Sequence, residues 1–428
     1  MKRILCGILL GVLWLSLFSS FESKAATQQS AVDWSPMFHH DLTREGYSTS
    51  SGPMTNKTLW TFATENSIEY CSPAVVDGVV YVGSDDGSIY ALNAATGNKL
   101  WSYQTGAAVE SSAAVANGIV YVGSDNDYVY ALNASTGQKV WAYKTGNEVY
   151  SSPAVYNGVV YVGSNDFNMY ALNAATGAKI WSYNTGNYIY SAPAIVDGVV
   201  YVNSYDAAYA LNVSTGSKIW SYTIGDYGFT YSTPAVCDGK VYFGSTNGNV
   251  YALDAATGTK LWNYTTGDEI ESSPAVANGI VYIGSDDDYV YALNAATGEK
   301  VWSFKTGNIV DASPTVISGA VYVGSEDSYV YALDPATGAE IWRYRTGTAV
   351  ESFASVANGV LYIGSDDNNV YAFGTITIPQ PSPSKPLGST PTTSPSQVPE
   401  YTLESIAAIL LALPALAIVK EAGKRKKS

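Results

Sequence analysis

The chain is poor in histidine, cysteine and charge. Its 428 residues include only two histidines, three cysteines and 14% charged residues, against 46% hydrophobic ones. This balance excludes an intrinsically disordered chain and a highly charged coiled coil. His39 and His40 both precede the repeats described below, so no histidine base can come from the repeats. The sequence also lacks neighbouring cysteines and a Cys-x-x-Cys-His motif, which excludes covalent haem attachment.

Positive charge is scarce as well. Lysine and arginine number 22 against 37 aspartates and glutamates, which gives a formal net charge of −15. A surface that binds nucleic-acid phosphates needs the opposite sign, so we expect no nucleic-acid partner. His39 and His40 lie beside Asp41, but we expect a capping or solvated pair there rather than a metal site.

The N-terminus carries an export pattern. Lys2 and Arg3 precede an apolar run over 4–18, and small residues at Ser23 and Ala25 suit cleavage after Ala25. We therefore predict a signal peptide over 1–25, with an uncleaved anchor helix as the alternative. Residues 26–57 then form a lead-in segment before the repeats.

The C-terminus predicts a tether. Residues 376–400 are rich in Pro, Ser and Thr, and seven prolines hold such a stalk extended. Within 401–428, fourteen uncharged residues over 406–419 precede a basic tail, a pattern that indicates a membrane anchor with a cytoplasmic tail. The order Pro399-Glu400-Tyr401, apolar segment, basic tail is also similar to archaeal PEF-type sorting signals, which implies cleavage and replacement by a lipid. Either route leaves the body at the outer face of a membrane.

Two further features bear on export. Four Asn-x-Ser/Thr sequons are glycosylation candidates: Asn56, Asn133, Asn212 and Asn263. Cys71 and Cys237 fall in the first and fifth repeats, on opposite sides of a ring, so we predict no disulfide between them.

A repeat of about 40 residues dominates the sequence. Tryptophan recurs at Trp60, Trp101, Trp141, Trp181, Trp220, Trp262, Trp302 and Trp342. Seven of these close the motif Ala-Leu-[Asn/Asp]-x-x-Thr-Gly-x-x-x-Trp. In the first repeat, turn residues such as Asp77-Gly78 separate four expected strands over 72–76, 79–84, 88–93 and 99–104. Four short strands per repeat predict a β-propeller.

The number of repeats predicts eight blades. Eight second strands carry a tyrosine at the same place, from Tyr81 to Tyr362, whereas the last repeat lacks its Trp strand. An orphan Trp strand over 58–62 should complete that blade and close the ring. We therefore predict an all-β, eight-bladed propeller of four-stranded antiparallel blades over 58–375. Seven blades and a stray strand are the alternative.

The repeat motif resembles the tryptophan-docking motif of pyrroloquinoline-quinone (PQQ)-type propeller repeats over 58–373. The resemblance implies that each tryptophan docks at a seam between blades. Some members of that family are quinoprotein dehydrogenases, which place a calcium-bound quinone on the axis and carry long insertions. Here the uniform repeat length leaves no room for a lid or inserted loop. We expect no enzymatic activity, no PQQ and no required cofactor, and an irregular fourth blade where Asn203 replaces the usual glycine.

The best site prediction is the ring of residues at the start of each first strand, which should rim the central funnel. They are Tyr70, Glu110, Tyr150, Tyr190, Tyr231, Glu271, Asp311 and Glu351. Carboxylates at Glu271, Asp311 and Glu351 could hold calcium, and tyrosine faces suit sugars or peptide side chains. A solvated channel mouth is the competing interpretation. We expect the acidic second turns, such as Asp85-Asp86, to be turn formers rather than calcium loops.

The sequence favours an exported, surface-tethered, monomeric propeller that serves as a binding or scaffold module for cell-surface proteins or glycans. Two alternatives stay open. One is a PQQ-dependent quinoprotein dehydrogenase. The other is an envelope assembly factor similar to the propeller lipoproteins that help to insert outer-membrane proteins.

Overall fold

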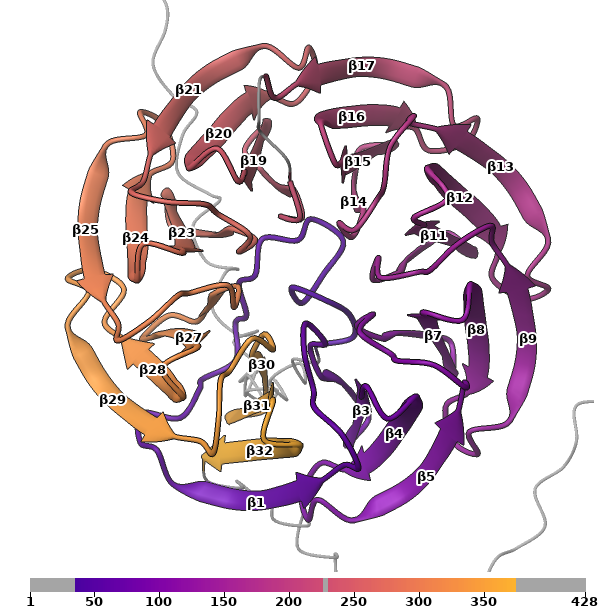
Figure 1. Cartoon of the computed structure of the whole chain (residues 1–428), viewed down its shortest axis with the longest axis horizontal. Coiled ribbons are helices and arrows are strands. Elements are labelled where there is room, and N and C mark those ends of the chain that lie inside the picture. The colour runs from indigo at the N-terminus through magenta and orange to yellow at the C-terminus, as the bar shows by residue number, and fades with distance from the viewer. Residues whose placement is uncertain (1–34, 226–229, 375–428) are drawn as a thin grey trace, which may run out of the picture. The chain divides into compact units, whose positions relative to one another are not determined.

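The computed structural model describes residues 35–225 and 230–374. Within them, the chain forms eight antiparallel sheets of four strands each, arranged around a central axis (Figure 1). The all-β, eight-bladed propeller predicted from the repeat is therefore confirmed. The signal peptide, the stalk and the C-terminal apolar segment predicted above lie outside the described residues. In the described part there is no helix long and apolar enough to cross a membrane.

Each blade has an inner, a second, a third and an outer strand. The inner strands are β2 (Ala74–Val76), β6 (Ala114–Ala116), β10 (Ala154–Tyr156), β14 (Ala194–Val196), β18 (Ala235–Cys237), β22 (Ala275–Ala277), β26 (Thr315–Val316) and β30 (Ser355–Ala357). The second strands are β3 (Val79–Gly83), β7 (Ile119–Ser124), β11 (Val159–Gly163), β15 (Val199–Ser204), β19 (Lys240–Gly244), β23 (Ile280–Ser285), β27 (Val321–Ser325) and β31 (Val360–Ser365). The third strands are β4 (Ser88–Asn93), β8 (Tyr128–Asn133), β12 (Asn168–Asn173), β16 (Ala207–Asn212), β20 (Asn249–Asp254), β24 (Tyr289–Asn294), β28 (Tyr329–Leu333) and β32 (Asn369–Gly374). The outer strands are β5 (Lys99–Gln104), β9 (Lys139–Lys144), β13 (Lys179–Asn184), β17 (Lys218–Thr223), β21 (Lys260–Thr265), β25 (Lys300–Lys305), β29 (Glu340–Arg345) and β1 (Thr58–Ala63).

Turn chemistry explains why the strands fold back on each other. Asp77 and Gly78 have φ angles of 51° and 76°, the left-handed pair that a tight hairpin needs. In the third turn, Oδ1 of Asn93 accepts hydrogen bonds from the amides of Ala95 and Thr96, both at 3.0 Å. This Asx turn closes the connection to the outer strand. Asn133 and Asn212, two of the glycosylation candidates, hold their turns in the same way.

Tryptophans dock at the seams between blades, as the family resemblance implied. Trp60 is 9% exposed, and its Nε1 donates to the carbonyl oxygen of Ala94 in the next blade at 2.9 Å. Trp181 is equally buried and donates in the same way to Val213 at 3.0 Å. The glycine of the Thr-Gly pair is required here, because a Cβ at Gly97 would lie 2.7 Å from the Trp60 ring. Each seam therefore joins one blade's outer strand to the next blade's third turn.

The ring closes with an N-terminal strand. β1 pairs with β32 in antiparallel register, with Trp60 opposite Ala372 and Ala63 opposite Asn369, and lies beside it in Figure 1. After the seventh repeat there is no further third turn for Trp342 to dock on. The lead-in segment substitutes for it, because the carbonyl oxygen of Pro53 accepts a hydrogen bond from Trp342 Nε1 at 3.0 Å. Ring closure therefore depends both on Pro53 in the lead-in segment and on the strand β1 that follows it.

The lead-in segment also plugs the central channel, which the sequence did not predict. In Figure 1 its indigo trace crosses the middle of the ring. Its carbonyl oxygens accept hydrogen bonds from inner-strand amides, with Leu42 bound to Ile195 at 2.7 Å and Glu45 to Val276 at 2.7 Å. Arg44 is fully buried in this plug and donates to the carbonyl oxygens of Phe38, Pro153 and Pro193. The plug therefore ties several blades together from inside.

The irregularity expected in the fourth blade is small. Its four strands pair in the usual order. The buried side chain of Asn203 donates from Nδ2 to the carbonyl oxygen of Ser232 at 2.7 Å. This Nδ2 atom joins the fourth blade to the fifth, whereas the buried Oδ1 of Asn203 has no hydrogen-bond partner.

Candidate functional site

The ring has two distinct faces. First and third turns share one face, because the amide of Ala94 in a third turn binds the carbonyl oxygen of Gly78 in a first turn at 2.9 Å. Second turns lie on the other face, beside the segments that lead into the inner strands. We call these the exit face and the mouth face. β32 ends at Gly374, opposite Val360 at a first turn, so the described chain leaves from the exit face.

A cavity of about 350 Å³ opens on the mouth face, and we call it the funnel. Seven of the eight predicted rim residues line it: Tyr70, Glu110, Tyr150, Tyr190, Tyr231, Glu271 and Asp311. The eighth, Glu351, is not part of the lining but hydrogen-bonds to Tyr70. Phe38 of the plug and Phe353 pack edge to face, with their centroids 5.1 Å apart, and also line the funnel. Sequence reasoning missed both phenylalanines, since neither belongs to the aligned rim position.

Blades three to five give the funnel an aromatic side. The rings of Tyr150, Tyr190 and Tyr231 form a chain with centroid separations of 5.6 Å and 5.0 Å, and we call it the tyrosine arc. Tyr188 and Tyr205 extend it outward, at 6.0 Å from Tyr190 and 6.3 Å from Tyr231. Such neighbouring ring faces suit planar, apolar or cationic groups.

Blades two and six to eight give the funnel rim an acidic side, whereas blade one contributes Tyr70. Glu110, Glu271, Asp311 and Glu351, which we call the acidic arc, are each partly buried. Burial, together with nearby Asp125 and Asp85, raises the pKa of Glu110 to about 8. Burial and the neighbouring Asp286 also raise the pKa of Glu271, to about 7. These carboxyls therefore keep part of their protons near neutral pH.

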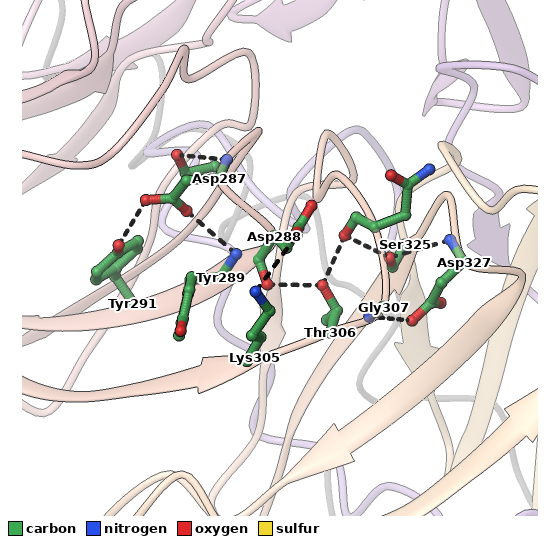
Figure 2. Close-up of polar contacts among 11 residues, drawn as sticks. Asp287, Asp288, Tyr289, Tyr291, Lys305, Thr306, Gly307, Ser325 and Asp327 are labelled. Atoms are coloured by element: carbon green, nitrogen blue, oxygen red, sulfur yellow. Dashed lines mark hydrogen bonds and ion pairs between the residues drawn. The ribbon is translucent and has the colours of Figure 1, made fainter.

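The acidic second turns contain two kinds of carboxylate. The second acid of these turns accepts hydrogen bonds on both side-chain oxygens, as Figure 2 shows for Asp287. Its Oδ2 accepts from the Tyr291 hydroxyl at 2.6 Å and from the Gly267 amide at 2.6 Å, and its Oδ1 accepts from the Tyr289 amide at 3.2 Å. Asp327 makes the same bonds to Gly307, in the loop of the neighbouring blade, and to Tyr331. The prediction of turn formers is therefore confirmed for this position.

The first acid of the same turns faces the funnel's rim. Asp286 lies within hydrogen-bonding reach of Asp311, and Asp366 within reach of Glu351. Asp125 is similarly placed toward Tyr150. The sequence analysis did not assign these residues to the rim, although a Ser-Asp pair at the end of four of the eight second strands was the available signal.

Calcium binding at Glu271, Asp311 and Glu351 stays a prediction. In the described part of the chain, no group of three or more His, Cys, Asp or Glu side chains is arranged so that it could hold a metal ion. PQQ fits this lining poorly. The quinone carries three carboxyl groups, whereas the described residues around the funnel include Glu110, Glu271 and Asp311 but no lysine or arginine. We therefore derive no reaction through it.

Sequence comparison identifies the family. A family model described as "Outer membrane protein assembly factor BamB" matches residues 42–114, 106–302 and 228–375. The chain belongs to this family of PQQ-type propeller repeat proteins. No curated protein matches the chain at a significant level.

Solved structures share the fold at low sequence identity. BamB from Moraxella catarrhalis is 21% identical with a TM-score of 0.65, and the match covers 75% of this chain and all of that one. Quinohemoprotein alcohol dehydrogenase from Comamonas testosteroni is 17% identical with a TM-score of 0.71, covering 88% of this chain and 84% of that one. The computationally designed protein Ika8 is 18% identical with a TM-score of 0.67, covering 74% of this chain and all of that one. A PQQ-type propeller is thus related in fold to an assembly factor, an enzyme and a designed ring.

Proposed function

We propose that this chain is a non-enzymatic binding and scaffold module of the cell envelope, which takes part of a protein or glycan partner into its funnel. The observation that carries the proposal is the funnel itself, whose lining includes four tyrosines, two phenylalanines and three carboxyl side chains. Small binding sites of this kind pair apolar or aromatic surface with a few convergent polar groups. The cavity of about 350 Å³ is large enough for one or two side chains or a sugar ring.

The buried histidine of the plug and the buried cysteine near the funnel supply no activated base or nucleophile, which favours a binding role. Among the described residues, His39 is buried within the plug, where burial lowers its pKa to about 3. Such a histidine stays neutral and does not exchange protons near neutral pH. Cys71 is also buried, and burial raises the pKa of its thiol to about 12. Neither side chain can serve as an activated group at the mouth.

The direction in which the chain leaves the ring suits a tether. We propose export and anchoring at the outer face of the membrane, on the strength of the N-terminal and C-terminal patterns. β32 ends at the exit face, whereas the funnel opens on the mouth face. A chain anchored through the residues after Gly374 would leave the funnel open to partners.

Arrays of glycans and of cell-surface proteins, probed with the purified full chain, test this function. The proposal expects binding to members of one class, lost when Tyr190 is replaced by alanine and kept when the exposed Ile180 is replaced. The opposing result is stoichiometric uptake of PQQ in the presence of calcium, with reduction of an electron-acceptor dye. That result would establish a dehydrogenase and overturn the proposal.

A role in envelope protein assembly is the second proposal. It is supported by the description of the matching family model and by the fold shared with BamB from Moraxella catarrhalis. The test is affinity purification of the full chain from its own membranes. Stoichiometric co-purification with a β-barrel assembly protein would favour this role, and recovery of the chain without one would count against it.

A further inference from the structure

The two acids of one second turn differ sharply in how their oxygens are used. Asp287 accepts three hydrogen bonds, two of which Figure 2 shows. Its neighbour Asp286 has a buried Oδ1 that receives none. A buried carboxylate oxygen without a donor is costly, so this difference within one turn calls for an explanation.

Buried oxygens without a hydrogen-bond partner recur around the rim. Buried Oδ1 atoms without a hydrogen-bond partner occur at Asp85, Asp125, Asn165, Asp286, Asp311 and Asp366, and we call them the collar oxygens. Five of them occupy the same position of the second turn in different blades, and Asp311 belongs to the rim beside Asp286. The side chain of Asn165 is 3% exposed, so its oxygen is enclosed almost completely. These oxygens act as acceptors when the carboxyls are ionised, and the donors within reach are the Tyr150 hydroxyl near Asp125 and a proton shared by Asp286 and Asp311.

No cation of the chain's own serves this region in the described residues. The ion pairs found there join Lys144 to Asp127 and Lys305 to Asp288, at 4.0 Å and 3.6 Å, on the outer strands. Around the funnel the carboxyls face one another and the hydroxyls of Tyr70 and Tyr150, and burial together with Asp286 raises the pKa of Asp311 well above its ordinary value. A positive group there would relieve this repulsion and would also supply donors.

The tyrosine arc completes a site for such a group. A lysine or arginine side chain has an apolar stem, which can pack along ring faces, and a head with three or five N–H donors. Cations also bind the faces of tyrosine rings. The chain already uses this contact on its surface, where Nζ of Lys144 lies 5.7 Å from the centre of the Tyr128 ring. In the funnel, Tyr231 and Glu271 come from adjacent blades and both line the cavity, where burial and the charge of Glu271 raise the pKa of Tyr231.

From this arrangement we infer that the funnel receives the positively charged side chain of a lysine or arginine presented by a partner polypeptide. The inference rests on the proposed binding function and specifies its ligand. The head binds the acidic arc and the nearest collar oxygens, and the stem packs against the tyrosine arc. A polypeptide is favoured over a bare metal ion because no described set of side chains is arranged to hold a metal, whereas single acceptors spread around a rim suit several N–H donors.

Calorimetric titration of the full chain with three end-blocked tripeptides tests the inference. The peptides are Gly-Arg-Gly, Gly-Lys-Gly and Gly-citrulline-Gly, of which the last keeps the shape of arginine without its charge. We expect both charged peptides to bind and the citrulline peptide to bind at least about tenfold more weakly, as expected when charge-assisted hydrogen bonds are lost. Binding should weaken between about 50 mM and about 500 mM NaCl.

Two double variants locate the site. Glu271→Gln/Asp311→Asn removes two carboxyls from the funnel, and Asp127→Asn/Asp288→Asn removes two from the outer side of second turns. Both change the formal charge equally. The first should weaken the charged peptides by about tenfold or more, whereas the second should leave their affinity unchanged. Circular dichroism of both variants reports whether they fold. The salt dependence of peptide binding is measured on the unmodified chain, so that test holds even if a variant fails to fold.

The remaining outcomes separate the inference from the function on which it rests. Equal binding of the citrulline peptide overturns the inference. The inference is also overturned if calcium binds the unmodified chain but not Glu271→Gln/Asp311→Asn, while no peptide binds. That result would assign the site to a metal. Funnel-dependent binding of a neutral glycan also overturns the inference but leaves the binding function intact. Uptake of PQQ overturns both.

Discussion

The carboxyl groups of Asp286 and Asp311 lie within hydrogen-bonding reach of each other, although they come from different blades. Two carboxyls at this distance cannot both ionise easily, so the pair holds a proton to higher pH than either would alone. Asp366 and Glu351 also lie within hydrogen-bonding reach of each other, but both belong to the eighth blade. Carboxyl groups are therefore concentrated around the funnel, and their mutual repulsion when ionised lowers the free energy of unfolding.

Stability should fall as pH rises from about 6.5 to about 9. Glu110 illustrates the sign: its pKa is 4.5 ordinarily and about 8 in the folded chain, where it faces Asp85, Asp125, Glu69 and Glu148. The folded state binds this proton more tightly than the unfolded state, so the stabilisation is complete below the ordinary pKa and is lost as pH rises through 8. Thermal melting across this range should show a declining midpoint.

The contribution of His39 to stability changes with pH in the opposite direction from that of Glu110, and it does so at lower pH. Its pKa is lowered from 6.5 to about 3, so it favours the folded state increasingly as pH rises to 6.5 and has little further effect above it. At the lower limit of the test range this residue is neutral in the folded state and about half protonated in the unfolded state, so its remaining effect is small. A melting midpoint that is flat or rises between the two limits would contradict the prediction.

Asp311→Asn should stabilise the chain at about pH 8. Burial and the charges of Asp286, Glu271 and Glu326 raise the pKa of Asp311 to about 9, so the folded chain must hold a proton there at pH 8. The amide of asparagine keeps the shape of the side chain and can donate to Asp286 without taking up a proton. We expect a gain of about 0.5–2 kcal/mol, measured by denaturant unfolding. Asp127→Asn is the matched control, since Asp127 faces Lys144 at 4.0 Å and should gain nothing. Destabilisation by Asp311→Asn would show that the carboxyl is well compensated.

Trp181→Ala should destabilise the chain by about 3–5 kcal/mol, because it opens a cavity at the seam between blades three and four. The indole is 9% exposed and donates to the carbonyl oxygen of Val213. Ile180, its neighbour in β13, is 49% exposed and provides the control. Ile180→Ala should change the free energy of unfolding by about 0.5 kcal/mol or less. Equal unfolding midpoints for the two variants would refute the seam role.

Arg44→Met should loosen the plug. The substitution removes hydrogen bonds to the carbonyl oxygens of Pro153 at 3.0 Å and Pro193 at 3.1 Å, and each acceptor left unsatisfied costs about 1–3 kcal/mol. Hydrogen exchange should accelerate at the amides of Ile195 and Val276, which bind the lead-in segment. Arg343→Met, which alters an exposed arginine on β29, should leave those amides protected. Unchanged exchange in both variants would show that the plug is held by its backbone alone.

Sequence periodicity predicted the ring because it depends on local features that repeat. Trp60 at a seam and Asp77-Gly78 in a hairpin each act within one or two blades, so their spacing carries the fold. The lead-in segment could not be predicted, because its contacts are backbone hydrogen bonds that any sequence can make. Only the buried Arg44 marks its path, and a single arginine gives no indication of burial in a sequence.

The rim was placed correctly from alignment, but its chemistry was only partly visible. Alignment of the residues at the start of each first strand identified Tyr70 and Asp311 as rim residues. It did not show that Asp286, from another blade, would approach Asp311. Contacts across a seam depend on the spacing of blades in the closed ring, which the repeat does not specify. Tyr70 also adopts a φ of 49°, a local departure that the alignment could not reveal.

The most direct test of the account measures proton release when a cation enters the funnel. Gly-Arg-Gly is titrated into the full chain at about pH 7.5, in two buffers with different ionisation enthalpies. If the arginine displaces protons held by Glu271 and its neighbours, the heat per mole bound must differ between the buffers, and this difference must vanish in Glu271→Gln/Asp311→Asn. A heat that is the same in both buffers, or no binding at all, would contradict the account.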